Sequence, residues 1–240
     1  MDFLWSGIRQ GWHLLVSGDP YLDHLIVVTL KVTAVSTIAA LVVGLPLGLV
    51  IGLGRFPGRG VARALANIGL VLPPVLVGLV LSLLMFPASP LGRFHLLFTL
   101  RGVYLAQSVL ALPIVTALTA SAVTSLPEGL IDQARAFGAS RTQQWALALR
   151  EARFGIATAT IAAVGSALSE VGAVVLVGGN IEGSDQTLAS AALEKVNAGQ
   201  FAEGVAIAIV LLGLIVLVVA ALTALQVRGA RFTAAGRSSA

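Results

Sequence analysis

The sequence predicts an all-α polytopic membrane protein with about five transmembrane helices. Of its 240 residues, 57% are hydrophobic and only 11% are charged, and the mean hydropathy is +0.96. A soluble domain averages about a quarter charged residues, so too few charges remain here to cover a water-exposed surface. The apolar residues also gather into five stretches. Each is long enough to cross a bilayer core, which needs roughly 20 residues per helix.

The five apolar stretches comprise residues 25–54, 62–86, 103–126, 156–178 and 204–227. Helices satisfy their own backbone hydrogen bonds, so we expect each stretch to be a helical span. Pro73 and Pro74 are expected to kink the second span, and Pro113 the third. The first span carries three glycines at four-residue spacing, Gly44, Gly48 and Gly52. This spacing predicts close helix packing, with a gating hinge as the alternative.

The two ends of the chain differ from the spans. Apolar residues recur at helical spacing in residues 2–17, and two of them are Trp5 and Trp12. This pattern predicts an amphipathic helix in the membrane interface over residues 1–20. Residues 21–228 then form the transmembrane domain, which includes a loop at 127–155. Residues 229–240 form a basic tail.

Basic residues are unevenly distributed between the two sets of loops. One set, with the C-terminal tail, carries ten arginines: Arg55, Arg59, Arg63, Arg135, Arg141, Arg150, Arg153, Arg228, Arg231 and Arg237. The other set carries five basic residues: Arg9, Lys31, Arg93, Arg101 and Lys195. Lys and Arg accumulate in cytoplasmic loops. We therefore expect a multi-pass protein of the plasma or inner membrane, with its N-terminus outside and its C-terminus in the cytoplasm.

The loop at 127–155 is the most informative part of the chain. Ser125 and Glu128 have capping-box spacing and Pro127 suits a first turn, which predicts a helix over about 127–137. Gly138 is expected to end this helix, because glycine accepts the left-handed conformation of a C-cap. A second short helix is expected over 139–147. The alternative is an ordinary amphipathic loop that carries positive charge on the cytoplasmic side.

This pattern resembles the cytoplasmic signature of ABC importer permeases, in which Glu-Ala-Ala precedes a glycine by three residues and a second helix follows. Asp132-Gln133-Ala134 takes the place of the triplet, Gly138 matches the glycine, and Ala139-Ser140-Arg141 follows it. Asp replaces Glu, Gln replaces Ala, and Leu149-Arg150 stands where Leu-Pro is usual. The resemblance implies the type I (MetI/ModB-like) importer permease fold and a loop that contacts a separate ATPase. The residues it implies for this coupling are Asp132, Ala134, Gly138, Ala139, Ser140, Arg141, Gln144 and Trp145.

A second resemblance lies in the fourth span. Ser169-Glu-Val-Gly-Ala173 resembles a fourth-helix segment of molybdate and tungstate permeases, and Val177-Gly-Gly-Asn-Ile181 is most similar to the tungstate type. Glu170 is an ionisable residue within a span, hence a candidate functional residue, and helical spacing places it on one face with Ser166. The candidates for the pathway or gate are Ser166, Ser169, Glu170, Gly172, Gly178, Gly179 and Asn180.

Two alternatives stay open at these positions. Glu170 can instead be a buried glutamate that is hydrogen-bonded between helices. Gly178 and Gly179 can form a plain helix C-cap, or with Asn180 they can present backbone N–H groups to an anion.

The resemblance implies a permease subunit for an oxyanion, with tungstate expected in this branch and molybdate or another anion as the alternative. No Gly-x4-Gly-Lys-Ser/Thr phosphate loop occurs, so the chain is not expected to be an enzyme. ATP and Mg²⁺ are expected on the partner ATPase, and no cofactor, metal or nucleic acid on this chain. The expected partners are a second copy of the chain, a cytoplasmic ABC ATPase dimer, an extracytoplasmic substrate-binding protein and membrane lipid.

Two rival functions remain possible at this point. A secondary transporter working without an ATPase predicts internal repeats and several charges within the membrane. Only Glu170 lies deep in a predicted span. A membrane scaffold that transports nothing would make the loop at 127–155 incidental.

Overall fold

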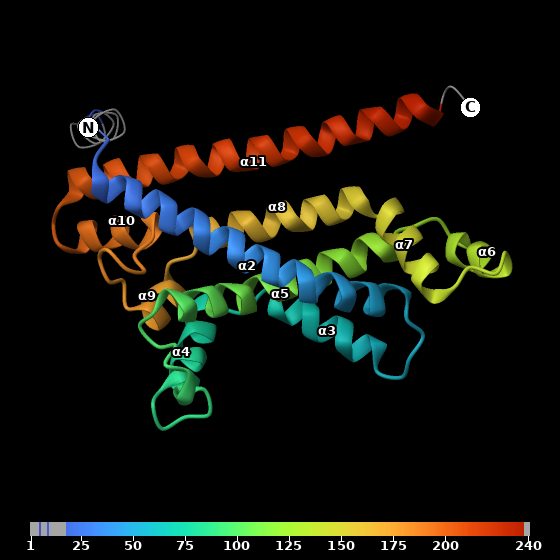
Figure 1. Ribbon diagram of the computed structural model, residues 1–240, viewed down its shortest axis with the longest axis horizontal. Helices are drawn as coiled ribbons and strands as arrows, with labels where there is room; N and C mark the ends of the chain where they lie inside the picture. The colour runs from blue at the N-terminus through green and yellow to red at the C-terminus, as the bar shows by residue number, and fades with distance from the viewer. Residues whose placement is uncertain (1–4, 6–8, 10–17, 238–240) are drawn as a thin grey trace. The chain divides into compact units, whose positions relative to one another are not determined.

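The computed structural model describes residues 5, 9 and 18–237, with side chains up to residue 227. All regular secondary structure in residues 18–237 is helical (Figure 1). The elements are α2 (Pro20–Leu53), α3 (Arg59–Gly69), α4 (Pro74–Met85), η1 (Gly92–Phe94), α5 (Leu100–Thr124), α6 (Leu130–Ala136), α7 (Arg141–Glu151), α8 (Arg153–Ser169), α9 (Gly172–Gly178), α10 (Leu188–Asn197) and α11 (Phe201–Arg237). The expected interfacial helix over 1–20 lies almost wholly outside the described residues.

Three single helices are long and apolar enough to cross a membrane, namely α2, α5 and the 201–227 part of α11. Two bent helix pairs bring the number of candidate spans to five. The prediction of an all-helical protein with about five spans is therefore confirmed. Helix α11 continues to Arg237, so most of the expected tail is helical backbone.

The second and fourth predicted spans are broken, contrary to the expectation of one helix each. The second divides into α3 and α4, which meet at an angle of 101°. Pro73 has an extended backbone there and Pro74 begins α4, where a missing N–H costs least. The fourth divides into α8 and α9 at Glu170 and Val171. By contrast, α5 continues through Pro113, so this proline does not divide the third span.

The chain forms two compact units. Among the described residues 18–237, the first comprises 18–37, 72–110 and 164–219. In this unit, α10 lies beside the first turns of α2 and α11 (Figure 1). The buried residues that join them are Leu22, Leu25, Leu188, Ala191, Ile207 and Val210. Helix α4 packs tightly on α9, because a Cβ at Gly78 would lie 2.7 Å from the Ala173 Cα.

The second unit comprises residues 38–71, 111–163 and 220–240. Within it, the glycine face of α2 packs on α5. A Cβ added at Gly44 or Gly48 would lie 2.8 Å from Val115 or 2.6 Å from Thr119, and one at Gly52 would lie 2.9 Å from Val123. Real Cβ atoms are not found at such distances. The prediction that these glycines serve close helix packing is confirmed.

Candidate functional site

The loop after α5 folds into two short helices, but α6 begins later than expected. Gly129, with φ of 80°, precedes its first residue, Leu130. The predicted capping box is wrong, because the Ser125 hydroxyl donates to the Ser121 carbonyl at 2.7 Å instead. Ser125 therefore completes the end of α5 and does not cap α6.

Gly138 forms the elbow between α6 and α7. Its φ is 82°, in the left-handed region that favours glycine. Its N–H donates to the Arg135 carbonyl at 2.9 Å, and the Ala139 N–H donates to the Ala134 carbonyl at 3.0 Å. No heavy atom lies within 4 Å of a Cβ built at Gly138. The backbone conformation, and not crowding, is therefore what requires glycine here.

Helix α7 begins with a capping box that sequence reasoning missed. The Gln143 N–H donates to the Ser140 hydroxyl at 3.3 Å, and the Ser140 N–H donates to the Gln143 side-chain carbonyl at 2.7 Å. The signal was present, since serine followed by glutamine three residues later is a known cap pattern. The helix spans Arg141–Glu151, whereas 139–147 was expected.

A polar network joins α6 to α7 and to the end of α2. Asp132 accepts from Arg135 at 3.0 Å and from Arg55 at 3.3 Å. Arg135 also reaches the side-chain carbonyl of Gln144 at 3.5 Å, and Gln144 donates to the Ala139 carbonyl at 2.8 Å. Gln144 is buried, whereas Asp132 is exposed. Asp132 and Gln144 therefore hold the elbow in one arrangement.

Helix α7 is anchored on the ends of two long helices of the same unit. Ala148 and Ala152 are buried against Leu49 of α2 and Val123 of α5. The end of α2 is itself capped, because Arg59 donates to the carbonyls of Ile51 and Gly52, both at 2.7 Å. A force applied to the elbow would therefore be transmitted to α2 and α5.

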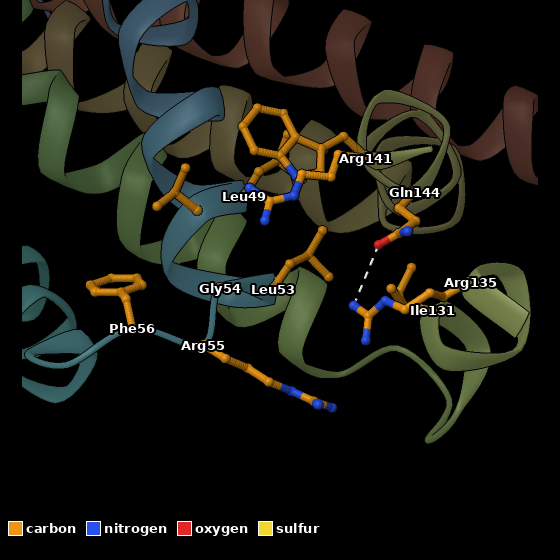
Figure 2. A pocket seen from close by; sticks show the side chains of 11 residues that line it. Leu49, Leu53, Gly54, Arg55, Phe56, Ile131, Arg135, Arg141 and Gln144 are labelled. Carbon is orange, nitrogen blue, oxygen red and sulfur yellow. Dashed lines mark hydrogen bonds between the residues drawn. The ribbon is translucent and has the colours of Figure 1, made fainter. Parts of the chain in front are cut away.

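A cavity of about 370 Å³ lies between the end of α2, α6 and α7. Figure 2 shows side chains from all three helices around it, among them Leu53, Arg135 and Arg141. Trp145 also lines it and is 37% exposed. Phe137, which sequence reasoning did not select, projects from the elbow with 92% of its surface exposed. An apolar residue directly before the predicted glycine elbow was the available signal for it.

The first unit contains the other set of predicted residues. Ser169 ends α8, and its hydroxyl donates to the Gly165 carbonyl at 2.9 Å. Glu170 lies in the break and accepts from the Ala173 N–H at 3.1 Å. The expected helical face shared by Glu170 and Ser166 is therefore wrong, because α8 ends before Glu170. The carboxylate instead accepts a hydrogen bond from the first turn of α9, the end of a helix where negative charge is favourable.

The close approach of α4 to α9 continues at Gly172. A Cβ there would lie 2.6 Å from a methyl group of Val75. At the other end of α9, Gly179 forms the C-cap with φ of 91°, and its N–H donates to the Val175 carbonyl at 3.0 Å. Asn180 follows, also with positive φ, at 56°.

A polar cluster lies beside this cap, with Asp185 and Gln186 buried and Glu194 exposed, and sequence reasoning missed most of it. Asn180 and Gln186 both donate to one oxygen of Glu194, and Gln186 accepts from the Tyr21 hydroxyl at 2.8 Å. Asp185 is fully buried and accepts from the Ile181 N–H at 2.6 Å. Burial raises the pKa of the Asp185 carboxyl, although backbone N–H groups of Ile181 and Asp185 itself oppose the change. Nothing in the sequence around Asp185 signals its burial.

The structure thus places the predicted coupling residues and the predicted pathway residues in different units. All eight coupling residues lie in the second unit and all seven pathway candidates in the first. The two-helix elbow, anchored on long apolar helices, is suited to mechanical contact with a soluble partner. A family model described as "Binding-protein-dependent transport system inner membrane component" matches residues 44–232.

The chain belongs to this family. It is an inner-membrane permease component of an ABC transporter, as the sequence predicted. Transport of this kind depends on a binding protein and an ATPase, which are therefore partners of this permease.

Individual relatives of this permease carry more specific names. A Haloferax volcanii protein named "Probable anion ABC transporter permease protein" is 42% identical over 206 residues, which cover 82% of this chain and 89% of the relative. A tungstate uptake system permease protein, TupB of Campylobacter jejuni, is 35% identical over 212 residues, covering 88% of this chain and 89% of the relative.

The permease also shares its fold with a solved structure. A chain of the MetNI methionine ABC transporter, in an inward-facing conformation, has a TM-score of 0.69 and 23% identity. The likeness covers 89% of this permease and 96% of that chain. The type I, MetI-like fold expected from the sequence is therefore confirmed.

Proposed function

We propose that this permease, as a homodimer, forms the translocation pathway of an ABC importer for an oxyanion, and that the oxyanion is tungstate. The names of the Haloferax and Campylobacter relatives support an anion and tungstate respectively. The similarity of residues 169–173 and 177–181 to segments of tungstate-type permeases supports the same substrate. Molybdate is the second candidate, because residues 169–173 also resemble a segment of molybdate permeases.

The observation that carries the proposal is the elbow of α6 and α7. Residues Asp132, Ala134, Gly138–Arg141, Gln144 and Trp145 would contact the ATPase on the cytoplasmic side. The network of Asp132, Arg135 and Gln144 keeps the elbow rigid. Closure of the ATPase dimer would then move α7 and, through Ala148 and Ala152, the ends of α2 and α5.

The pathway residues would act at the break between α8 and α9. Discontinuous helices mark binding sites and gates in many transporters, because unpaired backbone groups face the pathway there. Ser166, Ser169, Glu170 and Gly172 would form the gate, and Gly178, Gly179 and Asn180 its outer side. A carboxylate repels an oxyanion, so Glu170 would serve the gate and not bind the substrate. An extracytoplasmic binding protein would deliver the anion to the outer loops.

The test is ATP hydrolysis by the reconstituted complex of permease, ATPase and loaded binding protein, titrated with tungstate, molybdate and sulfate. We expect stimulation at the lowest concentration of tungstate. Gly138→Pro should abolish the stimulation, because proline requires φ near −65° and removes the N–H bonded to Arg135. Gly58→Pro is the matched control. Gly58 also has φ of 85°, and a Cβ added there would meet no described heavy atom within 4 Å beyond its chain neighbours, but it lies in a different loop.

Each outcome has a distinct meaning. Stimulation by molybdate at lower concentration than tungstate would make molybdate the substrate. A complex that assembles but responds to none of the three anions would contradict the oxyanion proposal. Equal loss of stimulation in both glycine variants would contradict the coupling role of the elbow.

A further inference from the structure

The cavity between α2, α6 and α7 has an apolar side and a cationic side. Leu49, Val50 and Leu53 supply the apolar side, and they belong to the last two turns of the α2 span. Arg55, which follows directly, lies on the cationic side. The cavity therefore lies where a membrane span ends, the level at which lipid headgroups meet hydrocarbon.

Three guanidinium groups line the cationic side: Arg55, Arg135 and Arg141 (Figure 2). None of the described residues that line the cavity is a carboxylate. Asp132 lies outside the wall and pairs with both Arg55 and Arg135. Arg141 has no ion pair among the side chains that the structure describes. One exposed carboxylate therefore pairs with two of the three cations, which leaves an excess of positive charge for an anion.

The backbone around the cavity does not oppose an anion. The C-terminal end of a helix carries partial negative charge, and α2 ends beside the cavity. Arg59 covers that end by its two hydrogen bonds to the Ile51 and Gly52 carbonyls. On the other side, Arg141 and Gln144 place the N-terminal turn of α7 at the cavity, and this end of a helix favours negative charge.

We propose that this cavity binds the headgroup of an anionic phospholipid from the adjacent leaflet. Arg55, Arg135 and Arg141 bind the phosphate, because guanidinium groups match phosphate oxygens in charge and geometry. The glycerol and first acyl carbons lie against Leu49, Val50 and Leu53. The volume of about 370 Å³ is that of a small-molecule site.

Lipid fits this cavity better than two other anions do. A free inorganic anion would leave the apolar wall uncovered. An acidic segment of the ATPase would likewise leave the apolar side of Leu49, Val50 and Leu53 uncovered. A bound phosphate would join Arg55 beside α2 to Arg135 of α6 and Arg141 of α7. Anionic lipid would thereby hold the elbow against the membrane.

Trp145 is a natural reporter because it lines the cavity. The chain has three tryptophans, so Trp5→Phe with Trp12→Phe leaves Trp145 alone. The full-length chain would be placed in lipid nanodiscs of two kinds. One contains phosphatidylglycerol and the other phosphatidylcholine, each brominated near the headgroup. We expect phosphatidylglycerol to quench Trp145 with roughly fivefold higher relative affinity, which corresponds to about 1 kcal/mol for one surface arginine.

The double variant Arg55→Gln with Arg141→Gln should lower the affinity for phosphatidylglycerol relative to phosphatidylcholine to near one. Arg150→Gln is the matched control, since Arg150 is exposed on α7 and does not line the cavity. Native mass spectrometry of retained phosphatidylglycerol gives a second measurement that does not depend on the position of Trp145.

Four results would overturn the proposal. Equal quenching by both lipids would show that no selective site exists, and equal loss in Arg150→Gln would reduce the effect to general surface charge. Displacement by millimolar inorganic phosphate would make the cavity a free-anion site. Displacement by added ATPase would make it an ATPase contact. Substrate-stimulated ATP hydrolysis is a separate measurement and tests the proposed transport function independently of lipid binding.

Discussion

Asp185 shows how burial alone changes the chemistry of a side chain. One oxygen accepts from the Ile181 N–H, and the other is buried without a hydrogen-bond partner among the described residues. A Cβ at Gly178 would lie 2.7 Å from that second oxygen, so the carboxyl group is closely enclosed. Loss of water disfavours the charged form and raises the pKa of Asp185.

This raised pKa predicts a pH-dependent stability. The stability that Asp185 contributes to the folded state is fully present below its unfolded pKa of 3.8. It is lost as the pH rises through the higher pKa of the folded state. Asp185→Asn keeps the acceptor for Ile181 without the charge. We therefore expect the melting temperature of Asp185→Asn, relative to that of the unaltered protein, to rise as the pH increases from 4 to 8. Thermal unfolding of the detergent-solubilised protein measures this difference.

Asp23→Asn is the control for this prediction, because it removes a carboxylate from an exposed position on α2. A melting-temperature difference for Asp185→Asn that stays constant or shrinks with rising pH would contradict the assigned cause.

At the scale of elements, helix packing in the second unit depends on the absence of side chains on one face of α2. Gly44, Gly48 and Gly52 each leave room for a residue of α5 that lies 71 positions later: Val115, Thr119 and Val123. A constant offset means that the two helices run in the same direction with matched turns. Such close contact maximises van der Waals packing, which stabilises helix pairs in lipid.

The central contact is the most sensitive to substitution. In Gly48→Ala the new Cβ would lie 2.6 Å from Thr119 and 2.9 Å from the Thr116 carbonyl, so the helices must separate. We expect destabilisation of about 1–3 kcal/mol. Gly213→Ala on α11 meets no atom within 4 Å and should be neutral, or stabilising by about 0.5–1 kcal/mol. Unfolding in mixed micelles compares the two variants, and equal effects would contradict the packing argument.

For the whole molecule, the distribution of arginine predicts the orientation in the membrane. The elbow between α6 and α7 should face the cytoplasm, and the loop between α9 and α10 should face outside. The chain contains no cysteine, so single cysteines can be introduced without background. Ala136→Cys and Ser184→Cys place a thiol at an exposed position in each loop.

In intact cells, a membrane-impermeant maleimide should label Ser184→Cys and leave Ala136→Cys unlabelled until the membrane is permeabilised. Labelling only after permeabilisation confirms that the thiol at 136 is reactive and that its protection came from the membrane. The reverse pattern would invert the proposed topology, and with it the side on which the ATPase binds.

The predicted site divides into residues that local rules revealed and residues that they did not. Gly138 could be predicted because a helix that ends in a left-handed residue favours glycine, whatever surrounds it. The cap at Ser140 followed an equally local rule. Asp132 was singled out by its place in a motif. Its bond to Arg55, 77 positions earlier, follows no sequence pattern because it depends on how α2 and α6 meet.

The sequence by itself determined that the chain is helical, that it crosses the membrane about five times and that it presents a glycine elbow on its basic side. These properties arise from hydropathy and backbone preference, which neighbouring residues set. Only the tertiary structure decided that Glu170 serves the start of α9, that Asp185 is buried, and that three arginines share one cavity. The solvation and partners of these charged groups depend on elements that are distant in sequence, so local pattern carries no information about them.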